Sequence, residues 1–298
     1  SDLDERNVYF FRVAVSNSLI SFVSKNVGVF VTNSASSTIP EPILWLDATD
    51  SSANSGTWLD KSSQGNNAVR HGSPSANGNK WNNLPVMEYS GSNGNYHEFS
   101  EITDARTILW VVKPEKSNWV WLLGDNNRYP FHPRGTSVFA NYANPNGARN
   151  GIFWKNGVSI HGSSAKLPPT HSWNVLASRA VSNIEVRNFS NDRNINGRCF
   201  RGDLAELIIY NKPLSDTEIQ YQEGYLAHKW GLQDMLPESH PFKTIFMNSD
   251  PVVGPNTASI AIGDSLDLSL SSNIQDANIT VYNLPSDLSL STTNSLRI

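Results

Sequence analysis

The sequence has few charges, a single cysteine and no long apolar run. Of its 298 residues 17% are charged, and 23 basic against 27 acidic side chains leave a net charge of −4. The basic residues form no cluster, which argues against a nucleic-acid-binding surface. Cys199 stands alone, so a disulfide framework within the chain and a cysteine-rich metal site are both excluded. No stretch approaches the ~18 apolar residues of a membrane-spanning helix, so we expect no membrane span in this chain.

Aromatic and small polar residues are abundant in this chain, whereas charged residues are few. Aromatic residues make up 10% of the chain, nine of them tryptophan, and Ser, Thr, Asn and Gly dominate much of the rest. This composition is too aromatic for a disordered chain and is typical of many secreted all-β proteins. We therefore expect the protein to be secreted or displayed on a cell surface.

Short runs of β-branched and aromatic residues, separated by Asn, Gly, Ser and Pro, predict a chain of strands. In the central part these are residues 43–47, 86–89, 107–113, 119–123, 137–142, 151–155, 158–161, 173–180, 183–189 and 203–210. Asn156-Gly157 predicts a two-residue hairpin, because both residues can take the positive φ of a type I′ turn. Many short strands with such connections favour a β-sandwich or jelly roll.

One helix is predicted after the last of these strands. Ser215 and Glu218 have the spacing of a capping box. Ile219 and Trp230 lie on one helical stripe, and Gly231 takes the place of the glycine that ends many helices. We expect this helix to pack Trp230 against the sandwich.

The two ends of the chain differ from the central part in their sequence patterns. Residues 8–15 (VYFFRVAV) and 27–32 (VGVFVT) predict two strands that resemble the end of a fibronectin type III or immunoglobulin-like module. Near the C-terminus, ITVYNLPSDLSLST alternates apolar and polar residues and is similar to cadherin-like repeats of the immunoglobulin fold. We expect both ends to be partial domains joined to the central part by linkers.

The central part carries a more specific set of motifs. They are ILWLDATD at residues 43–50, WLDKS at 58–62, TILWVVKP at 107–114, GDLAELIIY at 202–210 and then EGYLAHKWGL. Together they resemble the laminin G-like, concanavalin A-like jelly-roll domains of bacterial multidomain surface proteins. The resemblance implies an all-β fold, a concanavalin A-like jelly-roll β-sandwich with one short C-terminal helix, flanked by partial immunoglobulin-like segments.

The expected domain organisation follows from these resemblances. Residues 1–33 would end a fibronectin III or immunoglobulin-like domain, and 34–42 form a Ser- and Pro-rich linker. The jelly roll takes residues 43–245. A second linker at 246–257 leads to the start of a cadherin-like or immunoglobulin-like domain at 258–298.

Some proteins of this fold are glycan-cleaving enzymes, and their catalytic motifs can be compared with this sequence. Laminarinase-type hydrolases carry E-x-D-x-x-E on one strand, because glycoside hydrolysis needs a pair of carboxylates facing one cleft. This chain has no such motif, and the spacing of Glu98, Glu101 and Asp104 puts successive carboxylates on opposite strand faces. The R-x-E and Q-x-H strands of alginate-lyase-type enzymes are missing too. We therefore expect no catalytic activity.

A structural calcium ion is a second implication of the resemblance. In jelly rolls of this kind a Ca²⁺ often joins the first strand to the last, and Asp47 and Asp203 take those positions. Asp60 would complete the oxygen ligands that Ca²⁺ prefers. The alternative is that Asp47 and Asp60 cap turns and that Asp203 pairs with an arginine, either Arg198 or Arg201.

Two loops combine the residue types that bind sugars, namely aromatic rings, amides and charged groups. The candidate ligand-binding residues are Asp125, Asn126, Arg128, Tyr129, Arg134, Arg149, Asn150 and Trp154. Trp154 has an alternative role in the sandwich core, which is the role we expect for Trp110 and Trp173.

The function expected from the sequence is therefore binding. The chain would be a non-enzymatic extracellular adhesion module that recognises a polysaccharide or a surface protein, with neighbouring β domains of the same protein beside it. A structural spacer or filament subunit is the alternative, since exposed strands can pair with another chain. A glycan-cleaving enzyme is the least favoured reading.

Overall fold

The computed structural model describes residues 39–76, 80–116, 122–125, 130–141, 147–193, 195 and 198–244, together with the backbone of several strands at the two ends. The chain divides into two compact units. One is Pro40–Lys243, and the other joins Ser1–Ile39 to Thr244–Ile298. In the part of the chain that is described, no helix combines the length and apolar character needed to cross a membrane.

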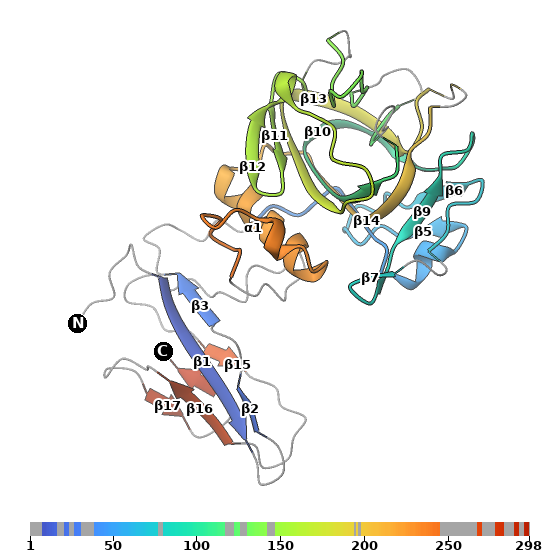
Figure 1. Cartoon of the computed structure of the whole chain (residues 1–298). Helices are drawn as coiled ribbons and strands as arrows, with labels where there is room; N and C mark the ends of the chain where they lie inside the picture. Colours follow the sequence, from blue (N-terminus) through green and yellow to red (C-terminus); the bar gives the residue numbers. More distant parts are fainter. Residues whose placement is uncertain are drawn as a thin grey trace. The chain divides into compact units, whose positions relative to one another are not determined.

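The unit Pro40–Lys243, called the central unit below, is built on one nine-stranded antiparallel sheet. Its main path runs in the order β12–β11–β13–β10–β14–β4, with β6, β5 and β9 attached to its flank (Figure 1). The strands are β4 (Leu44–Asp47), β5 (Thr57–Trp58), β6 (Ala68–His71), β9 (Met87–Ser90), β10 (Tyr96–Pro114), β11 (Ile152–Lys155), β12 (Val158–His161), β13 (Asn174–Phe189) and β14 (Arg201–Tyr210). The short strands β7 (Lys80–Trp81) and β8 (Leu84–Pro85) pair with each other.

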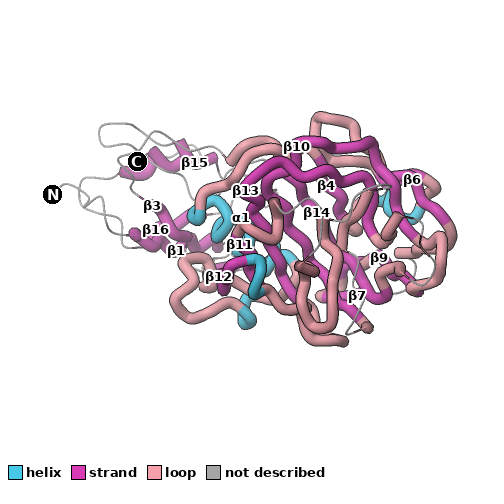
Figure 2. The backbone as a smooth tube through the Cα atoms, turned by 90° about the horizontal axis from the view of Figure 1, so that it is seen from above, coloured by secondary structure: helices cyan, strands magenta, loops and turns pink. Residues whose placement is uncertain are grey.

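The two longest strands, β10 and β13, give the sheet its curvature (Figures 1 and 2). Register shifts interrupt their pairing between Glu98 and Thr107. Such irregularities bend a strand and increase its twist. Beyond the bend, the first residues of β10 pair with β6, where Tyr96 lies opposite His71. The part of β10 beyond the bend therefore pairs with β6, which in turn pairs with β5. The sequence analysis began this strand at residue 107 and so did not predict the bend.

The core of the central unit is rich in aromatic residues, and the consecutive buried residues of β10 and β14 show that both faces of the sheet are covered there. Trp110 of β10 packs edge-on against Phe131, with ring centroids 4.9 Å apart, and Phe139 lies between Phe131 and Phe153 of β11. Trp110 and Trp173 are both buried, as expected. The strand predicted over 137–142 is wrong for its described residues, which form bends, a turn and isolated bridges and place the ring of Phe139 in the core.

The predicted helix is confirmed as α1 (Asp216–Lys229). Both hydrogen bonds of the capping box between Ser215 and Glu218 are present. Gly231 has a φ of 64° just beyond the helix, and Trp230 is fully buried. The hairpin prediction is also confirmed, because Asn156 and Gly157 join β11 to β12 with positive φ angles. Three short 3₁₀ helices complete the unit, at Ser51–Asn54, Gly162–Ser164 and Gln233–Met235.

The N-cap gives a first testable prediction. Ser215→Ala is expected to lower the free energy of unfolding by about 1 kcal/mol, because the amide of Glu218 loses its side-chain acceptor. Ser215→Asp is the matched control, since its carboxylate can cap the helix and suits the positive helix end. Urea unfolding followed by tryptophan fluorescence reports the central unit, because all nine tryptophans lie between residues 45 and 230. Equal loss in both variants would contradict this role.

The two ends of the chain share one sheet in the backbone that is described. β1 (Val8–Ser16) pairs antiparallel with β16 (Asn278–Tyr282), and also with β2 (Ser21–Val23) and β3 (Val27–Phe30). A second small sheet contains β15 (Asp267–Ser269), β17 (Ser289–Ser291) and β18 (Ser295–Arg297). The sequence analysis assigned these two stretches to different partial domains, whereas the backbone pairs them within one unit.

Candidate functional site

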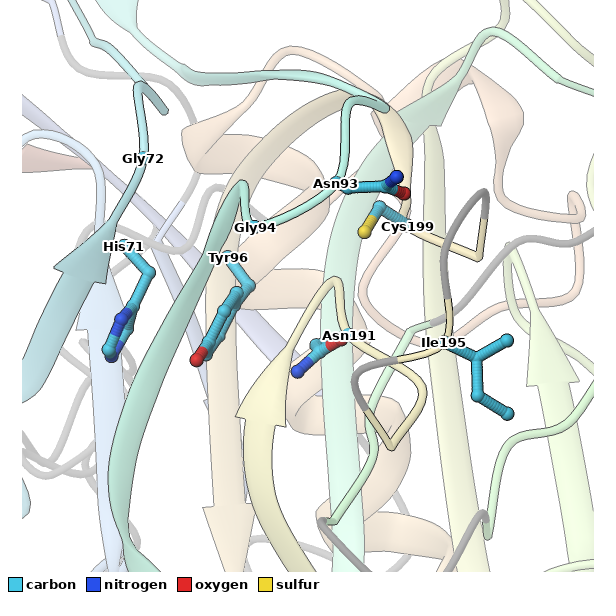
Figure 3. A pocket seen from close by; sticks show the side chains of 8 residues that line it. All are labelled: His71, Gly72, Asn93, Gly94, Tyr96, Asn191, Ile195 and Cys199. Carbon is cyan, nitrogen blue, oxygen red and sulfur yellow. The ribbon is translucent and has the colours of Figure 1, made fainter.

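A cavity of about 390 Å³ opens beside the bent end of β10 (Figure 3). Its lining comes from three separate segments, and consists of His71, Asn93, Tyr96, Asn191, Ile195 and Cys199 with the glycines Gly72 and Gly94 between them. Its volume lies within the range of about 300–1,000 Å³ that is common for small-ligand sites. No carboxylate is among the lining residues that the structure describes, so a pair of acids for glycoside hydrolysis does not face this cavity.

An aromatic pair forms one wall of the cavity. The rings of His71 and Tyr96 are stacked at 4.2 Å with an angle of 5° between their planes. They come from neighbouring strands, because β6 and β10 pair there with these two residues opposite each other. Figure 3 shows Tyr96 between His71 and Asn191, so His71 covers one face of the tyrosine ring and the other face borders the cavity. Both rings are half-buried.

Contacts with Glu98 fix this wall from outside. His71 Nε2 lies 3.0 Å from Glu98 Oε2, and Arg187 Nε donates to Glu98 Oε1 at 2.8 Å. The histidine ring is thereby held against Tyr96 before any ligand arrives. A preorganised ring of this kind loses little conformational entropy on binding.

The single cysteine of the chain, Cys199, also lines this cavity. Cys199 is buried, as expected for a small apolar residue. Burial raises the pKa of its thiol, even though the backbone amides of Gly94 and Asn95 oppose that shift. Thiols react as thiolates, and a raised pKa favours the protonated thiol.

The sequence-predicted ligand residues are not brought together at this cavity. Asp125 is buried, Arg134 is exposed, and Trp154 is buried beneath the guanidinium of Arg179, which lies 5.1 Å from the ring centroid. Trp154 therefore takes the core role that was its alternative. Arg149 and Asn150 lie just before β11, and Asn150 borders a second cavity of about 330 Å³. Asn126, Arg128 and Tyr129 lie outside the described residues.

His71, Asn93, Tyr96 and Asn191 were missed by the sequence analysis. They are distant in sequence, and only the bend of β10 and its pairing with β6 collect them. One signal was available, since His71 and Tyr96 each adjoin a glycine-containing turn at the end of a strand. A single sequence, however, does not indicate which two strand ends pair with each other.

The three carboxylates proposed for calcium are each occupied by protein donors. Asp60 accepts hydrogen bonds from the amides of Trp45, Ser62 and Asn66 at 2.8–2.9 Å, and from the Ser62 hydroxyl at 2.7 Å. This is the turn-capping alternative. Asp203 pairs with Lys113. The expected arginine partners bind elsewhere, Arg201 to Glu115 and Arg198 to Asp192.

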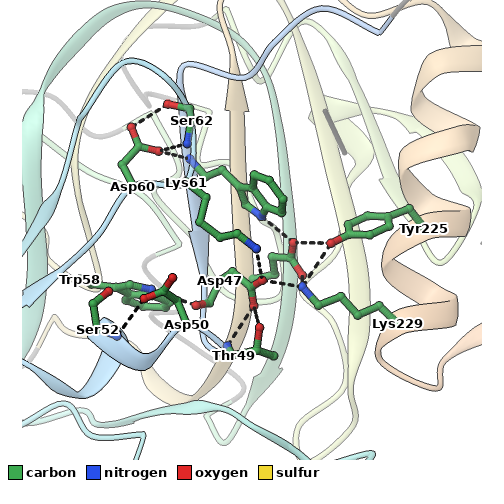
Figure 4. Close-up of polar contacts among 12 residues, drawn as sticks. Asp47, Thr49, Asp50, Ser52, Trp58, Asp60, Lys61, Ser62, Tyr225 and Lys229 are labelled. Carbon is green, nitrogen blue, oxygen red and sulfur yellow. Dashed lines mark hydrogen bonds and ion pairs between the residues drawn. The ribbon is translucent and has the colours of Figure 1, made fainter. Parts of the chain in front are cut away.

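Asp47, the first of these carboxylates, is bound by two lysines (Figure 4). Lys229 Nζ lies 2.8 Å and Lys61 Nζ 3.0 Å from its Oδ2 atom. Two ammonium groups on the same oxygen do not fit a cation site. Across the described residues no group of three His, Cys, Asp or Glu side chains is arranged to hold a metal ion. The calcium ion stays a prediction, and these three residues as arranged do not form its cage.

The same lysine joins Asp47 to a second buried carboxylate. Glu206 of β14 is fully buried and accepts hydrogen bonds from Lys229 Nζ and from the indole of Trp230, both at 2.8 Å. The indole of Trp45 and the hydroxyl of Tyr225 donate to its other oxygen, at 2.7 and 3.2 Å. We call Asp47, Glu206, Lys61 and Lys229 the buried charge cluster.

The charges of this cluster balance one another. Burial alone would raise the pKa of Asp47, but Lys229 and Lys61 hold it below its usual value. Burial would lower the pKa of Lys229, but Glu206 and Asp47 raise it. For Glu206, burial dominates and raises the pKa, with Lys229 opposing. The cluster ties α1 to β4 and β14, and it contains the residues that carried the family resemblance.

A smaller buried pair fixes the end of the unit. Glu223 of α1 accepts a hydrogen bond from the amide of Gly157 at 2.9 Å, and His240 Nε2 lies 3.7 Å from its other oxygen. Burial raises the pKa of Glu223. These contacts hold the β11–β12 turn, the helix and the following tail together, which is a structural role.

Comparison of the chain with protein-family models, curated proteins and solved structures gives no match.

Proposed function

We propose that this chain is a non-enzymatic extracellular binding module, part of a larger multidomain surface protein, that recognises a carbohydrate in the cavity of Figure 3. The central unit would be a laminin G-like jelly roll, as the motifs of the sequence suggest. The observation that carries the proposal is the stacked pair of His71 and Tyr96 beside the amide groups of Asn93 and Asn191.

The chemistry of this lining suits a sugar. The apolar CH face of a pyranose can lie on the free face of the Tyr96 ring. Sugar hydroxyls both donate and accept hydrogen bonds, and so do the side-chain amides of asparagine. The lining residues contain no cluster of one charge, which suits an uncharged ligand better than a phosphate or a polycation. The lack of a carboxylate pair supports binding without cleavage.

A glycan array and a polysaccharide pull-down with the full chain test this proposal, each run in Ca²⁺ and in EDTA. We expect selective binding that Tyr96→Ala weakens by about tenfold or more, the factor that corresponds to a lost contact of about 1.4 kcal/mol. His71→Ala is expected to weaken binding as well, because it removes the ring that supports Tyr96. Loss of binding in EDTA would support the predicted calcium ion.

Two variants serve as controls. Tyr96→Phe keeps the ring and is expected to retain most of the affinity. His161→Ala removes an exposed histidine of β12 that does not border the cavity, and should bind like the unmodified chain. No binding on the array in either buffer, or binding that Tyr96→Ala leaves unchanged, would contradict the proposal.

A structural role in an assembly is the second candidate. All four residues of β12, the last strand on its side of the main sheet, are exposed, and Val158 and Ile160 are 58% and 43% accessible. At the opposite edge, β4 is covered by the segment at Asp60 and Lys61. An uncovered edge strand can pair with a strand of another chain. Concentration-dependent assembly together with a silent glycan array would favour this role.

A further inference from the structure

The contacts of Lys229 place one amine between two buried carboxyl groups. Its Nζ atom lies 2.8 Å from Asp47 Oδ2 and 2.8 Å from Glu206 Oε2. The side chains of Asp47 and Glu206 are 1% and 0% accessible, and that of Lys229 is 17% accessible. The three residues come from β4, β14 and the end of α1, so the fold itself assembles them.

Aromatic residues surround the two carboxyl groups, which are shielded from water. The indoles of Trp45 and Trp230 donate to Glu206, and the indole of Trp58 donates to the backbone carbonyl of Asp47 at 3.0 Å. All three tryptophans are buried. Charged groups are costly in such surroundings, whereas a neutral amide with the same neighbours is not.

We propose that Lys229 and Asp47 condense to an intramolecular amide bond, with Glu206 as the group that moves the protons. The observed geometry is that of the reactants, with the amine one hydrogen bond away from the carboxyl group that it would attack. Holding two reacting groups in contact replaces the encounter that limits the same reaction in solution. This inference is independent of the carbohydrate site.

The reaction balances without any further reagent. Lys229 begins as an ammonium and Asp47 as a carboxylate. Glu206 accepts a proton from Nζ, the freed amine attacks Asp47 Cγ, and a C–N bond forms. The C–Oδ2 bond then breaks, and Oδ2 leaves as one water molecule with two protons, the one that Glu206 accepted and now returns and a second one from the nitrogen. The product is a neutral amide, and the charges of Glu206 and Lys61 remain balanced.

The two oxygens of Asp47 have different neighbours, which suits this reaction. Oδ1 accepts hydrogen bonds from the amide and the hydroxyl of Thr49, at 2.9 and 2.8 Å. These donors can stabilise the negative charge that develops on the retained oxygen, as in an oxyanion hole. Oδ2 contacts Lys61 and Lys229, so the departing oxygen lies beside ammonium groups that can supply or relay protons.

The same contacts explain why Asp47 and not Glu206 is the acceptor. Each oxygen of Glu206 accepts a hydrogen bond from a buried indole, one from Trp45 and one from Trp230. Loss of either oxygen would leave an indole N–H buried without a partner, which is unfavourable. Loss of Oδ2 from Asp47 has no such effect, because Lys61 is 28% accessible and can be hydrated.

The bond would close most of the central unit into a covalent loop. Asp47 and Lys229 are 182 residues apart, close to the two ends of Pro40–Lys243. A pulling force applied through the two ends would then pass along the amide and spare most of the sheet. This property would suit a module of a surface protein that bears load.

Intact mass spectrometry of the full chain under denaturing conditions tests the proposal. We expect a mass lower than that of the sequence by one water molecule. Tandem spectra should then show a branched peptide that joins Asp47 to Lys229. Lys229→Arg, Asp47→Ala and Glu206→Ala are each expected to have the full mass of their sequence.

A matched control comes from a second lysine–aspartate contact. Lys113 and Asp203 also form a close pair, with Asp203 buried, and neither residue belongs to the buried charge cluster. Lys113→Met should still show the loss of one water. A folded unmodified chain with its full sequence mass, and with the peptides of Asp47 and Lys229 separate, would overturn the proposal whether or not the variants fold.

Discussion

Replacing Lys229 with methionine is expected to lower the free energy of unfolding of the central unit by about 3–5 kcal/mol, the range typical for removal of one member of a buried ion pair. The change leaves Glu206 without an ammonium partner, while Asp47 keeps only Lys61. Methionine preserves most of the side-chain volume, so the loss reports the charge and not a cavity. Where the proposed amide forms, Lys229 carries no charge, and the variant loses that covalent bond in place of the ion pairs.

Lys212→Met is the control for this prediction. Lys212 is exposed, and surface substitutions away from special features change stability by less than about 0.5 kcal/mol. Chemical unfolding followed by tryptophan fluorescence measures both variants against the unmodified chain. A midpoint for Lys229→Met that equals that of Lys212→Met would show that the buried charge cluster contributes little to stability.

The second large effect is a loss of folding stability at acidic pH. Burial lowers the pKa of His97 to about 3, with smaller contributions from Arg70 and His71. The ring is fully buried, where Nδ1 contacts the hydroxyl of Tyr89 at 2.7 Å. Between about pH 3 and the ordinary histidine value of about 6.5, the unfolded chain binds more protons than the folded one. Stability contributed by the neutral ring is therefore complete above that window and is lost as the pH falls through it.

The size of this loss follows from the same pKa difference. At about 1.4 kcal/mol per pKa unit, lowering the pH from about 7 to about 4 is expected to remove roughly 3 kcal/mol through His97. Glu206 and Glu223, whose pKa values are raised by burial, contribute in the opposite sense, because their stabilising effect is lost as the pH rises.

His97→Phe separates this residue from the others. The variant keeps an aromatic ring but cannot be protonated, so its unfolding free energy should depend on pH less steeply between about 7 and about 4, by the same ~3 kcal/mol. The slope, and not the absolute stability, is the quantity to compare, because the variant also removes the partner of Tyr89. Parallel pH profiles for the two proteins would show that His97 does not control acid sensitivity.

Local patterns were enough to predict much of the fold. The capping box at Ser215, the glycine at Gly231 and the Asn156-Gly157 turn depend on neighbouring residues alone, and each is present. Strand positions such as β11, β12 and β14 also follow from short apolar runs. Strand length did not, since β10 starts 11 residues before the run that marked it, in a stretch with several charges.

The two sites depend on contacts between residues that are far apart in the sequence, and local sequence patterns do not predict such contacts. The bend of β10 decides that His71 meets Tyr96, and no local pattern indicates such a bend. Asp47 was predicted from the sequence as a calcium ligand, but its neighbours are lysines from the 58–62 motif and from α1. From one sequence, a carboxylate that binds a metal cannot be distinguished from one that pairs with a lysine 182 residues away.

We propose that ligand binding takes place in the cavity beside Tyr96, whereas the motifs that carry the family resemblance build the buried charge cluster. Amide chemical shifts of the isotope-labelled full chain, titrated with an oligosaccharide of the glycan selected on the array, test it most directly. The shifts are expected to change at His71, Gly72, Gly94 and Tyr96, on the wall of that cavity. Changes confined to residues 124–135 and 147–154, with those four amides unaffected, would contradict the claim and return the site to the loops predicted from the sequence.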